Sequence, residues 1–374
     1  MNAKKAMKQD LARVLLAPLA ALAVMLTSSA ASAKGKPPPP PPPPPVDSGT
    51  IYFNYNNGSA QQVCSMKPDG TSQTALPVLN AFGAEPSRVL HGGKRWFVTL
   101  QTIPNEFYPP DPDGNLYARQ ELFAVSQRGE WFQLTDNPAI EAFDPRWTLG
   151  AGGVDGRITV VAYRWVQDAN GKSISIEPGV YSIDVDPETW TSAPPAPQSP
   201  QRLDTILLPV ACDAVGCYAD VSGYDWSADG THVVYAASDG LYVTRASDGT
   251  SGQLLSVSGA AAPRWSPVQG NGRTQILFGV GGGSAGRIDR VNDDGTGWVT
   301  MVPAGSTSSI WIIDNSARWS PSGTHLIYNQ WTMDKKVWYR VKTSHVYRAA
   351  ADGSGKIDLT TQMTFCYGLG WMNP

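Results

Sequence analysis

A tryptophan-centred motif recurs along this chain and limits its possible folds more than any other feature. In each copy a Trp follows Arg, Asp or Gly, and in most copies Ser or Thr comes next, before a turn and a run of alternating apolar residues. The copies are Arg146-Trp147-Thr148, Asp225-Trp226-Ser227, Arg264-Trp265-Ser266-Pro267, Arg318-Trp319-Ser320-Pro321 and Gly370-Trp371. Their tryptophans lie 79, 39, 54 and 52 residues apart. A period of about 40 residues with insertions indicates a β-propeller with four strands, A to D from the centre outwards, in each blade.

The clearest unit of the repeat spans residues 224–256. Its strands are predicted at 224–227, 231–237, 241–245 and in the segment that ends at Ser256. Asp-Gly pairs mark the turns, because Gly accepts the positive φ that tight hairpins need. Six outer turns of this kind predict six blades. They are Pro68-Asp69-Gly70, Gln127-Arg128-Gly129, Val185-Asp186-Pro187-Glu188, Asp248-Gly249, Asp293-Asp294-Gly295 and Ala351-Asp352-Gly353.

The two ends of the repeat region are complementary. The first β stretch, Gly49 to Leu79, contains three strands and lacks an A strand, whereas Tyr367 to Trp371 reads as an A strand with no B, C or D strand after it. We therefore expect the N- and C-terminal strands to complete one blade together and close the ring. Closure of this kind removes two open sheet edges.

The repeat resembles that of the TolB-like family of six-bladed propellers, which reads P-x-W-S-P-D-G, a strand, and a strand ending in N-x-D-G-S. Residues 317–323 (ARWSPSG) and 350–355 (AADGSG) carry the resemblance, which extends over residues 50–374. It implies an all-β fold of six four-stranded antiparallel blades. We expect no counterpart of the N-terminal α/β domain of TolB ahead of the first blade. The blades are expected at 50–79 with 367–374, 86–136, 144–203, 224–256, 263–303 and 317–361.

The segment ahead of the propeller reads as an export signal and a spacer. Residues 1–33 have a basic start, an apolar run from Val14 to Leu26 that is too short to span a bilayer, and the cleavage pattern Ala31-Ser32-Ala33. Residues 34–48 contain nine consecutive prolines, which predict an extended polyproline spacer or a docking ligand. We expect a periplasmic or secreted protein of a bacterial envelope, a monomer with no membrane span after cleavage, and a propeller over 49–374.

Export to an oxidising compartment predicts that the four cysteines pair. Four cysteines allow three connectivities. Cys212 and Cys217 are close in sequence and can close a small ring, which leaves Cys64 to pair with Cys366 near the two ends of the folded region.

Two groups of residues are candidates for binding. The first group is expected to rim the central channel and meet an anionic or polar ligand, or else to stack on Trp and pair with Asp of an adjacent blade: Arg88, Arg146, Asp225, Arg264 and Arg318. The second group lies on long B–C hairpins at 103–119, 165–179 and 330–345, which share one face of a propeller with the D–A connections. It comprises Phe107, Tyr108, Trp165, Trp331, Lys335, Lys336, Trp338 and Arg340. Long aromatic hairpins on a rigid ring favour a recognition surface, although propellers also tolerate such insertions without function.

Other motifs carry no predicted chemistry. The glycine-rich stretch 281–286 lacks the following helix that a phosphate loop or nucleophile elbow needs, and reads as a flexible hairpin. Asp111, Asp113 and Asn115 lack the Gly and Glu of a calcium loop and read as a solvated loop. His91, His232, His325 and His345 lack zinc-site spacing and are expected at the surface, with His232 and His325 at equivalent repeat positions. No cofactor and no metal site is predicted.

These observations favour a non-enzymatic scaffold that recognises a protein or peptide partner in the cell envelope through the B–C/D–A face. A net charge of −3 for the whole chain, and of −6 without residues 1–33, argues against nucleic acid as the partner. The alternatives are a carbohydrate-active, lyase-type enzyme, which would need acid and base groups at the channel mouth, and a small-ligand or metal binder in the channel.

Overall fold

The structure is a computed structural model. It describes residues 48–373 except 57, 59–60, 80–83, 109–115, 151–152, 192–193, 214–215, 268–273, 282–285, 307–309, 337–340 and 364. The predicted signal peptide, the proline run, Asp111, Asp113 and Asn115 lie outside the described residues, as do Trp338, Arg340 and the middle of the glycine-rich stretch. Within the described part of the chain, no helix is long and apolar enough to cross a membrane.

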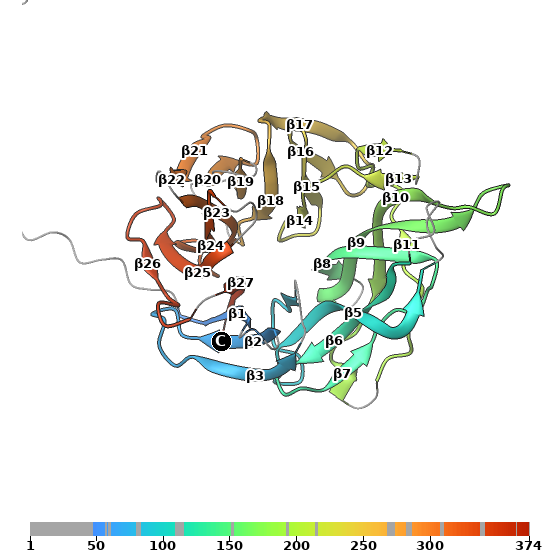
Figure 1. Ribbon diagram of the computed structural model, residues 1–374, viewed down its shortest axis with the longest axis horizontal. Coiled ribbons are helices and arrows are strands. Elements are labelled where there is room, and N and C mark those ends of the chain that lie inside the picture. The colour runs from blue at the N-terminus through green and yellow to red at the C-terminus, as the bar shows by residue number, and fades with distance from the viewer. Residues whose placement is uncertain are drawn as a thin grey trace, which may run out of the picture. The chain divides into compact units, whose positions relative to one another are not determined.

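Six antiparallel sheets stand around a central axis, as the sequence predicts (Figure 1). Blade 1 contains β27 (Cys366–Met372), β1 (Thr50–Asn56), β2 (Gln61–Met66) and β3 (Thr74–Leu79). Blade 2 contains β4 (Glu85–Pro86), β5 (Trp96–Phe107), β6 (Ala118–Ser126) and β7 (Trp131–Gln133). Blade 3 contains β8 (Ile140–Gly150), β9 (Gly153–Gln167), β10 (Ser173–Asp184) and β11 (Gln201–Arg202), with a short 3-10 turn, η1 (Thr189–Thr191).

The second half of the ring follows the same plan. Blade 4 contains β14 (Tyr224–Trp226), β15 (His232–Ala237), β16 (Gly240–Arg245) and β17 (Ser251–Ser256). Blade 5 contains β18 (Ala260–Trp265), β19 (Gln275–Val280), β20 (Arg287–Asn292) and β21 (Val299–Val302). Blade 6 contains β23 (Ile310–Trp319), β24 (His325–Asp334), β25 (Val341–Ala350) and β26 (Ile357–Asp358), and the two-residue strand β22 (Gly305–Ser306) makes it five-stranded. A separate hairpin of β12 (Val210–Cys212) and β13 (Cys217–Ala219) lies between blades 3 and 4.

Blade 1 closes the ring with strands from both ends of the chain, which confirms the prediction. Strand β27 pairs with β1, and Ile51 is opposite Trp371. The Trp371 indole also donates a hydrogen bond to the carbonyl of Ser48, 3.3 Å away. The innermost strand of this blade is therefore supplied by the last residues of the propeller.

The motif tryptophans are buried where blades meet. Trp147 is 2% exposed and donates to the Glu85 carbonyl of blade 2, 3.0 Å away. Trp319 of blade 6 is also buried and donates to the Arg264 carbonyl of blade 5, 3.3 Å away. A Trp side chain buries a large apolar area, and a buried indole N–H needs an acceptor. Trp147, Trp226 and Trp319 therefore each join their blade to the one before it by a hydrogen bond, whereas the buried indole N–H of Trp265 has no partner among the described residues.

The outer-turn glycines meet a second requirement besides positive φ. Five of the six outer turns place Gly against the outer part of the preceding blade, where an added Cβ would lie 1.9–3.3 Å from a backbone carbonyl oxygen. These glycines are Gly70, Gly129, Gly249, Gly295 and Gly353. At Gly353, where φ is +82°, the Cβ would be 1.9 Å from the Met301 oxygen. The Asp-Gly turns therefore set the close approach between blades as well as the chain reversal.

The predicted cysteine pairing is half right. Cys212 and Cys217 form a disulfide that links β12 to β13. Cys64 and Cys366 are free and buried, so the expectation of a second disulfide is wrong. Cys64 faces β1 from β2, and Cys366 faces β1 from β27. Strands two places apart are separated by about 9.5 Å, which exceeds the Cα separation of about 7 Å that a disulfide can bridge.

We therefore expect two reactive thiols per chain in denaturant without reductant, and none in the folded protein. Burial raises the pKa of the Cys64 thiol to about 11 and that of Cys366 to about 12, which suppresses the reactive thiolate at neutral pH. A colorimetric thiol titration with and without denaturant measures both counts. A count of zero in denaturant would show that Cys64 and Cys366 form a disulfide and would contradict this prediction.

The long B–C hairpins are mainly strand rather than loop. Strands β5 and β6, β9 and β10, and β24 and β25 continue beyond the blade body into two-stranded extensions. The disulfide hairpin packs on one of them, where Gly216 bridges to Ser175 of β10 and an added Cβ would lie 2.4 Å from Ser175 backbone atoms. The insertions at blades 3 and 4 thus pack against each other.

Candidate functional site

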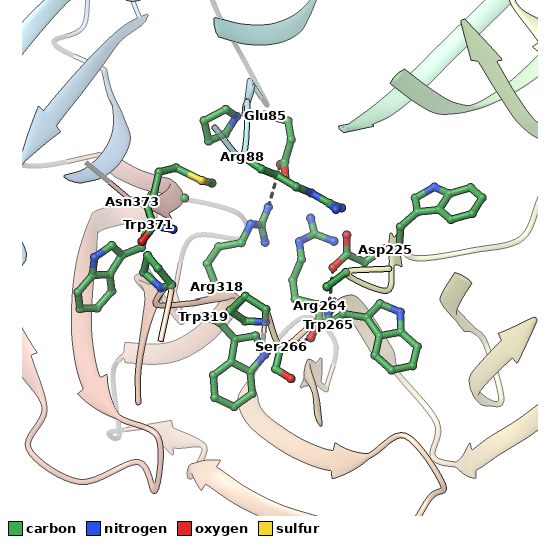
Figure 2. Close-up of a pocket in the computed structure, with 17 residues that line it drawn as sticks. Glu85, Arg88, Asp225, Arg264, Trp265, Ser266, Arg318, Trp319, Trp371 and Asn373 are labelled. Atoms are coloured by element: carbon green, nitrogen blue, oxygen red, sulfur yellow. Dashed lines mark hydrogen bonds and ion pairs between the residues drawn. The ribbon is translucent and has the colours of Figure 1, made fainter. Parts of the chain in front are cut away.

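The described residues contain a central pocket of about 220 Å³ that five blades build together (Figure 2). Its lining residues lie at the ends of the innermost strands β4, β14, β18, β23 and β27 and in the turns that follow them. The pocket therefore opens on the A–B face, opposite the long B–C hairpins. The channel residues predicted from the repeat line it: Arg88, Asp225, Arg264 and Arg318.

Arg264 is a buried cation at the pocket wall. It is 5% exposed, and its Nη1 donates to the carbonyls of Tyr224 and Pro263 at 3.0 and 2.7 Å. Its Nε has no hydrogen-bond partner, and no carboxylate lies within ion-pair distance of it among the described residues. Burial, and then the nearby positive charge of Arg146, lower the pKa of Arg264.

Arg318 extends into the pocket beside Arg264 in Figure 2. Its nearest carboxylate is Glu85, with Nη2 and Oε2 3.9 Å apart, and its Nε is buried without a partner. Burial, and then the charge of Arg264, lower the pKa of Arg318 to about 9. The guanidinium groups are still protonated at neutral pH, so the pocket holds positive charge that the protein only partly balances.

Arg146 lies at the centre of the ring but does not line the pocket. It is 3% exposed, forms an ion pair with Asp144 at 2.5 Å, and contacts Glu85 at 3.7 Å. Its guanidinium also lies over the Tyr224 ring, 5.6 Å from the centroid. Burial opposes the charge of Arg146, but Asp144 and Glu85 more than offset it, so its pKa is raised. Arg146 is therefore stacked and paired, but on Tyr224 rather than on Trp, and with Asp144 of its own strand rather than with Asp of an adjacent blade.

A buried histidine holds the segment that carries Arg88. The ring of His91 is 4% exposed and lies between two carboxylates, with Nε2 3.2 Å from Asp155 and Nδ1 2.9 Å from Glu188. Asp155 also accepts from the backbone N–H groups of Arg88 and Val89, at 2.7 and 3.1 Å. Since both ring nitrogens face acceptors, the doubly protonated ring fits this site best.

The stability that His91 contributes is expected to fall as pH rises. Burial disfavours its charge, but hydrogen bonds to Asp155 and Glu188 prevail and raise its pKa above the ordinary 6.5. The contribution is therefore complete below about pH 6.5 and is lost as pH passes the raised value. We expect His91→Gln to lower the free energy of unfolding more at pH 5.5 than at pH 8.5, as measured in urea. His232→Gln is the control, because its Nδ1 contacts the Thr231 hydroxyl instead; an equal pH effect in both variants would contradict the assignment.

The histidine expectations need correction. His91 and His325 are buried at 4% and 5% exposure, so they are not surface residues. His232 and His325 do occupy equivalent positions, since each ring contacts the preceding Thr hydroxyl at 2.8–2.9 Å. His345 is half-buried and contacts Asp358. No group of His, Cys, Asp and Glu among the described residues could hold a metal ion.

The predicted B–C surface is only partly exposed. Phe107 is 52% exposed, but Tyr108 is buried and donates from its hydroxyl to the Gln120 carbonyl at 2.8 Å. Trp165 is also buried, and its indole donates to Glu141 at 2.9 Å. The expectation that both rings are available to a partner is therefore wrong, since they pack within the strand extensions.

The remaining B–C candidates lie on the extension of blade 6. Trp331 is half-buried against the Tyr367 ring, with centroids 5.5 Å apart. Lys335 is half-buried and Lys336 is exposed. The structure does not bring these residues together with Phe107, which belongs to blade 2.

Three carboxylates near the centre were not predicted. Asp144 lies two residues before the motif Arg146, and this spacing could have identified it. Glu85 lies on a two-residue strand of a blade that lacks the Trp motif, so no sequence signal marks it. Asp155 belongs to blade 3 and is far from His91 in the sequence, so only the folded chain brings the two residues into contact.

No family model matches the chain, and no curated protein matches its sequence. Among solved structures, TolB from Acinetobacter baumannii is 13% identical over 87% of this chain and 67% of its own, with a TM-score of 0.55. A putative TolB from Agrobacterium tumefaciens is 17% identical over 86% and 91%, with a TM-score of 0.45. An oligogalacturonate lyase in complex with manganese is 13% identical over 74% and 72%, with a TM-score of 0.38. The first similarity shows the fold, which is that of a TolB-like six-bladed β-propeller.

Proposed function

We propose that this TolB-like propeller is a non-enzymatic scaffold that binds a protein or peptide partner across the mouth of the central pocket. One observation carries the proposal: five blades converge on a small pocket at one face of a closed ring. Its volume of about 220 Å³ is below the ~300–1,000 Å³ of pockets that enclose a whole small-molecule ligand. Such a pocket suits a single group that projects from a larger partner.

The chemistry at the pocket supports binding rather than catalysis. The carboxylates among its described lining residues are Glu85 and Asp225. Glu85 lies between Arg146 and Arg318, and Asp225 accepts the Trp265 backbone N–H at 2.9 Å. A general acid or base needs a proton-transfer path to substrate, and both groups are engaged with the protein. The nearby His91 is held between two carboxylates.

The surface that we propose is the A–B face rather than the B–C/D–A face that the hairpin lengths favoured. Val89 and Leu90 follow the pocket residue Arg88 and are 41% and 40% exposed. A partner that covers the mouth of the pocket would bury these two apolar side chains. On the opposite face, Tyr108 and Trp165 are buried within the strand extensions.

We place the partner outside the cytoplasm. The signal-like residues 1–33 and the Cys212–Cys217 disulfide both support export to an oxidising compartment, and the propeller is proposed to act there as a monomer.

Cross-linking capture from the envelope of the source organism tests the proposal. The bait is the mature chain, residues 34–374, and two variants report on the two faces. Leu90→Glu changes the A–B face, and the double variant Lys335→Glu, Lys336→Glu changes the B–C/D–A face. We expect one enriched protein that is lost with Leu90→Glu and kept with the lysine variant. Loss with the lysine variant alone would assign recognition to the opposite face and overturn the proposal.

A further inference from the structure

The geometry points to a carboxylate as the group that the pocket receives, bound between Arg264 and Arg318. This inference rests on the proposed function, and it names the partner chemistry: an acidic side chain or a C-terminus that enters the central pocket.

Arg264 is buried at the pocket wall without an ion-pair partner among the described residues. A guanidinium that is 95% buried has lost most of its hydration, and it recovers only the two carbonyl contacts of Nη1. Buried charges in proteins are normally paired with an opposite charge, because an unpaired one is costly. Within the described residues, Arg264 has no carboxylate at ion-pair distance, whereas Arg146 has Asp144 at 2.5 Å. Asp225, Asp144 and Glu85 lie near enough to Arg264 to favour its charge, but none of them is at ion-pair distance, so its guanidinium has room for a direct partner.

The side chains that line the pocket carry more positive than negative charge. Three arginines and two carboxylates are among the lining residues: Arg88, Arg264, Arg318, Glu85 and Asp225. Glu85 is shared, since its Oε2 is 3.7 Å from Arg146 and 3.9 Å from Arg318. One further negative charge between Arg264 and Arg318 would make the number of negative charges at the pocket wall equal to the number of positive charges.

A carboxylate also matches the planar shape of the arginine guanidinium groups in the pocket. Guanidinium groups bind carboxylates through two parallel N–H donors, which gives geometric specificity as well as energy. Trp226, Trp265 and Trp319 form apolar parts of the wall. In such surroundings, an ion pair is less screened than at an open surface. The small volume admits one side chain or one chain end.

Thermal unfolding of the mature chain with defined probes tests this inference. The probes are N-acetyl-aspartyl amide for an acidic side chain, N-acetyl-glycine for a C-terminus, N-acetyl-asparaginyl amide as the neutral match, and inorganic phosphate. All are used at pH 7 and equal ionic strength. At ten times its Kd, a bound carboxylate should raise Tm by about 2 °C. Whichever of the two carboxylate probes raises Tm more identifies the source of the carboxylate, an acidic side chain or a C-terminus.

Three variants complete the design. We expect Arg264→Gln and Arg318→Gln each to abolish the shift, and Arg164→Gln to keep it, because Arg164 is 44% exposed and pairs with Glu177 away from the pocket. Arg318 donates to the Ala317 carbonyl at 3.3 Å and pairs with Glu85 only at 3.9 Å, so its variant stays informative if Arg264→Gln fails to fold. No shift with either carboxylate, a shift with phosphate alone, or an equal shift in all variants would overturn the inference.

The two proposals fail separately. If the carboxylate probes shift Tm but Leu90→Glu still captures the partner, the carboxylate site stands and the proposed binding face fails. If Leu90→Glu loses the partner while Arg264→Gln and Arg318→Gln retain it, the binding face stands and the carboxylate inference fails.

Discussion

A chain that ends at residue 365 is expected to lose the stable propeller. The deletion removes β27, and with it the six residue pairs that join β27 to β1. It also removes Trp371, which is 3% exposed, and Cys366, which is fully buried in the same core cluster. Loss of a buried Trp side chain alone costs about 3–5 kcal/mol, and a folded domain is stable by only about 5–15 kcal/mol.

Circular dichroism and a thermal melt of the truncated chain measure this effect. The matched control deletes residues 34–44, a segment of similar size outside the propeller unit, and should melt like the mature chain. Adding the peptide 366–374 to the truncated chain should restore part of the cooperative transition if β27 pairs as an independent strand. A cooperative melt of the truncated chain at the temperature of the control would show that closure by β27 is dispensable.

Gly353→Ala is expected to destabilise the protein by about 3 kcal/mol or more. A residue other than Gly at φ +82° has a strain of about 1–2 kcal/mol. The added Cβ would also lie 1.9 Å from the Met301 oxygen, which forces the outer turn of blade 6 away from blade 5. Gly355→Ala provides the matched control, since Gly355 also has positive φ, +65°, but nothing lies within 4 Å of its Cβ.

Urea unfolding of the two variants separates strain from packing. The control should lose about 1 kcal/mol from backbone strain alone. The difference between the variants then reports the contact between blades 5 and 6. Equal losses would mean that the close approach at Gly353 adds nothing to the interface.

The sequence predicts the fold well because each blade repeats the same local signals. The Trp motif, the Asp-Gly turns and the alternating strands recur along the chain, so an element that is hard to predict in one blade can be recognised from the others. The shared blade is also predictable, because the lone strand at Tyr367–Trp371 needs the three strands that follow Gly49. Arg264 and Arg318 share one place in the repeat and line the same pocket, whereas Arg146, at the same place in its blade, does not line it.

The sequence indicates only part of the pairing of these arginines. Arg146 and Arg264 occupy the same motif position, yet only Arg146 has a carboxylate two residues before it. The pairing with Glu85 depends on blades that meet across the channel. In the same way, Tyr108 and Trp165 look like exposed loop residues until the strands extend and bury them. Local patterns specify strands and turns, whereas charge balance and burial depend on contacts between distant segments.

The shared blade also affects how the chain folds. Ser48 and Trp371, which meet in blade 1, are separated by 323 residues, so their contact has one of the largest sequence separations in the molecule. Chain entropy delays such contacts until the intervening segments are compact. We therefore expect blades 2–6 to assemble first and the β1–β27 pairing to be a late, slow step. Until then β1 has an open edge, so we expect the almost complete ring to be the species most prone to aggregate during folding.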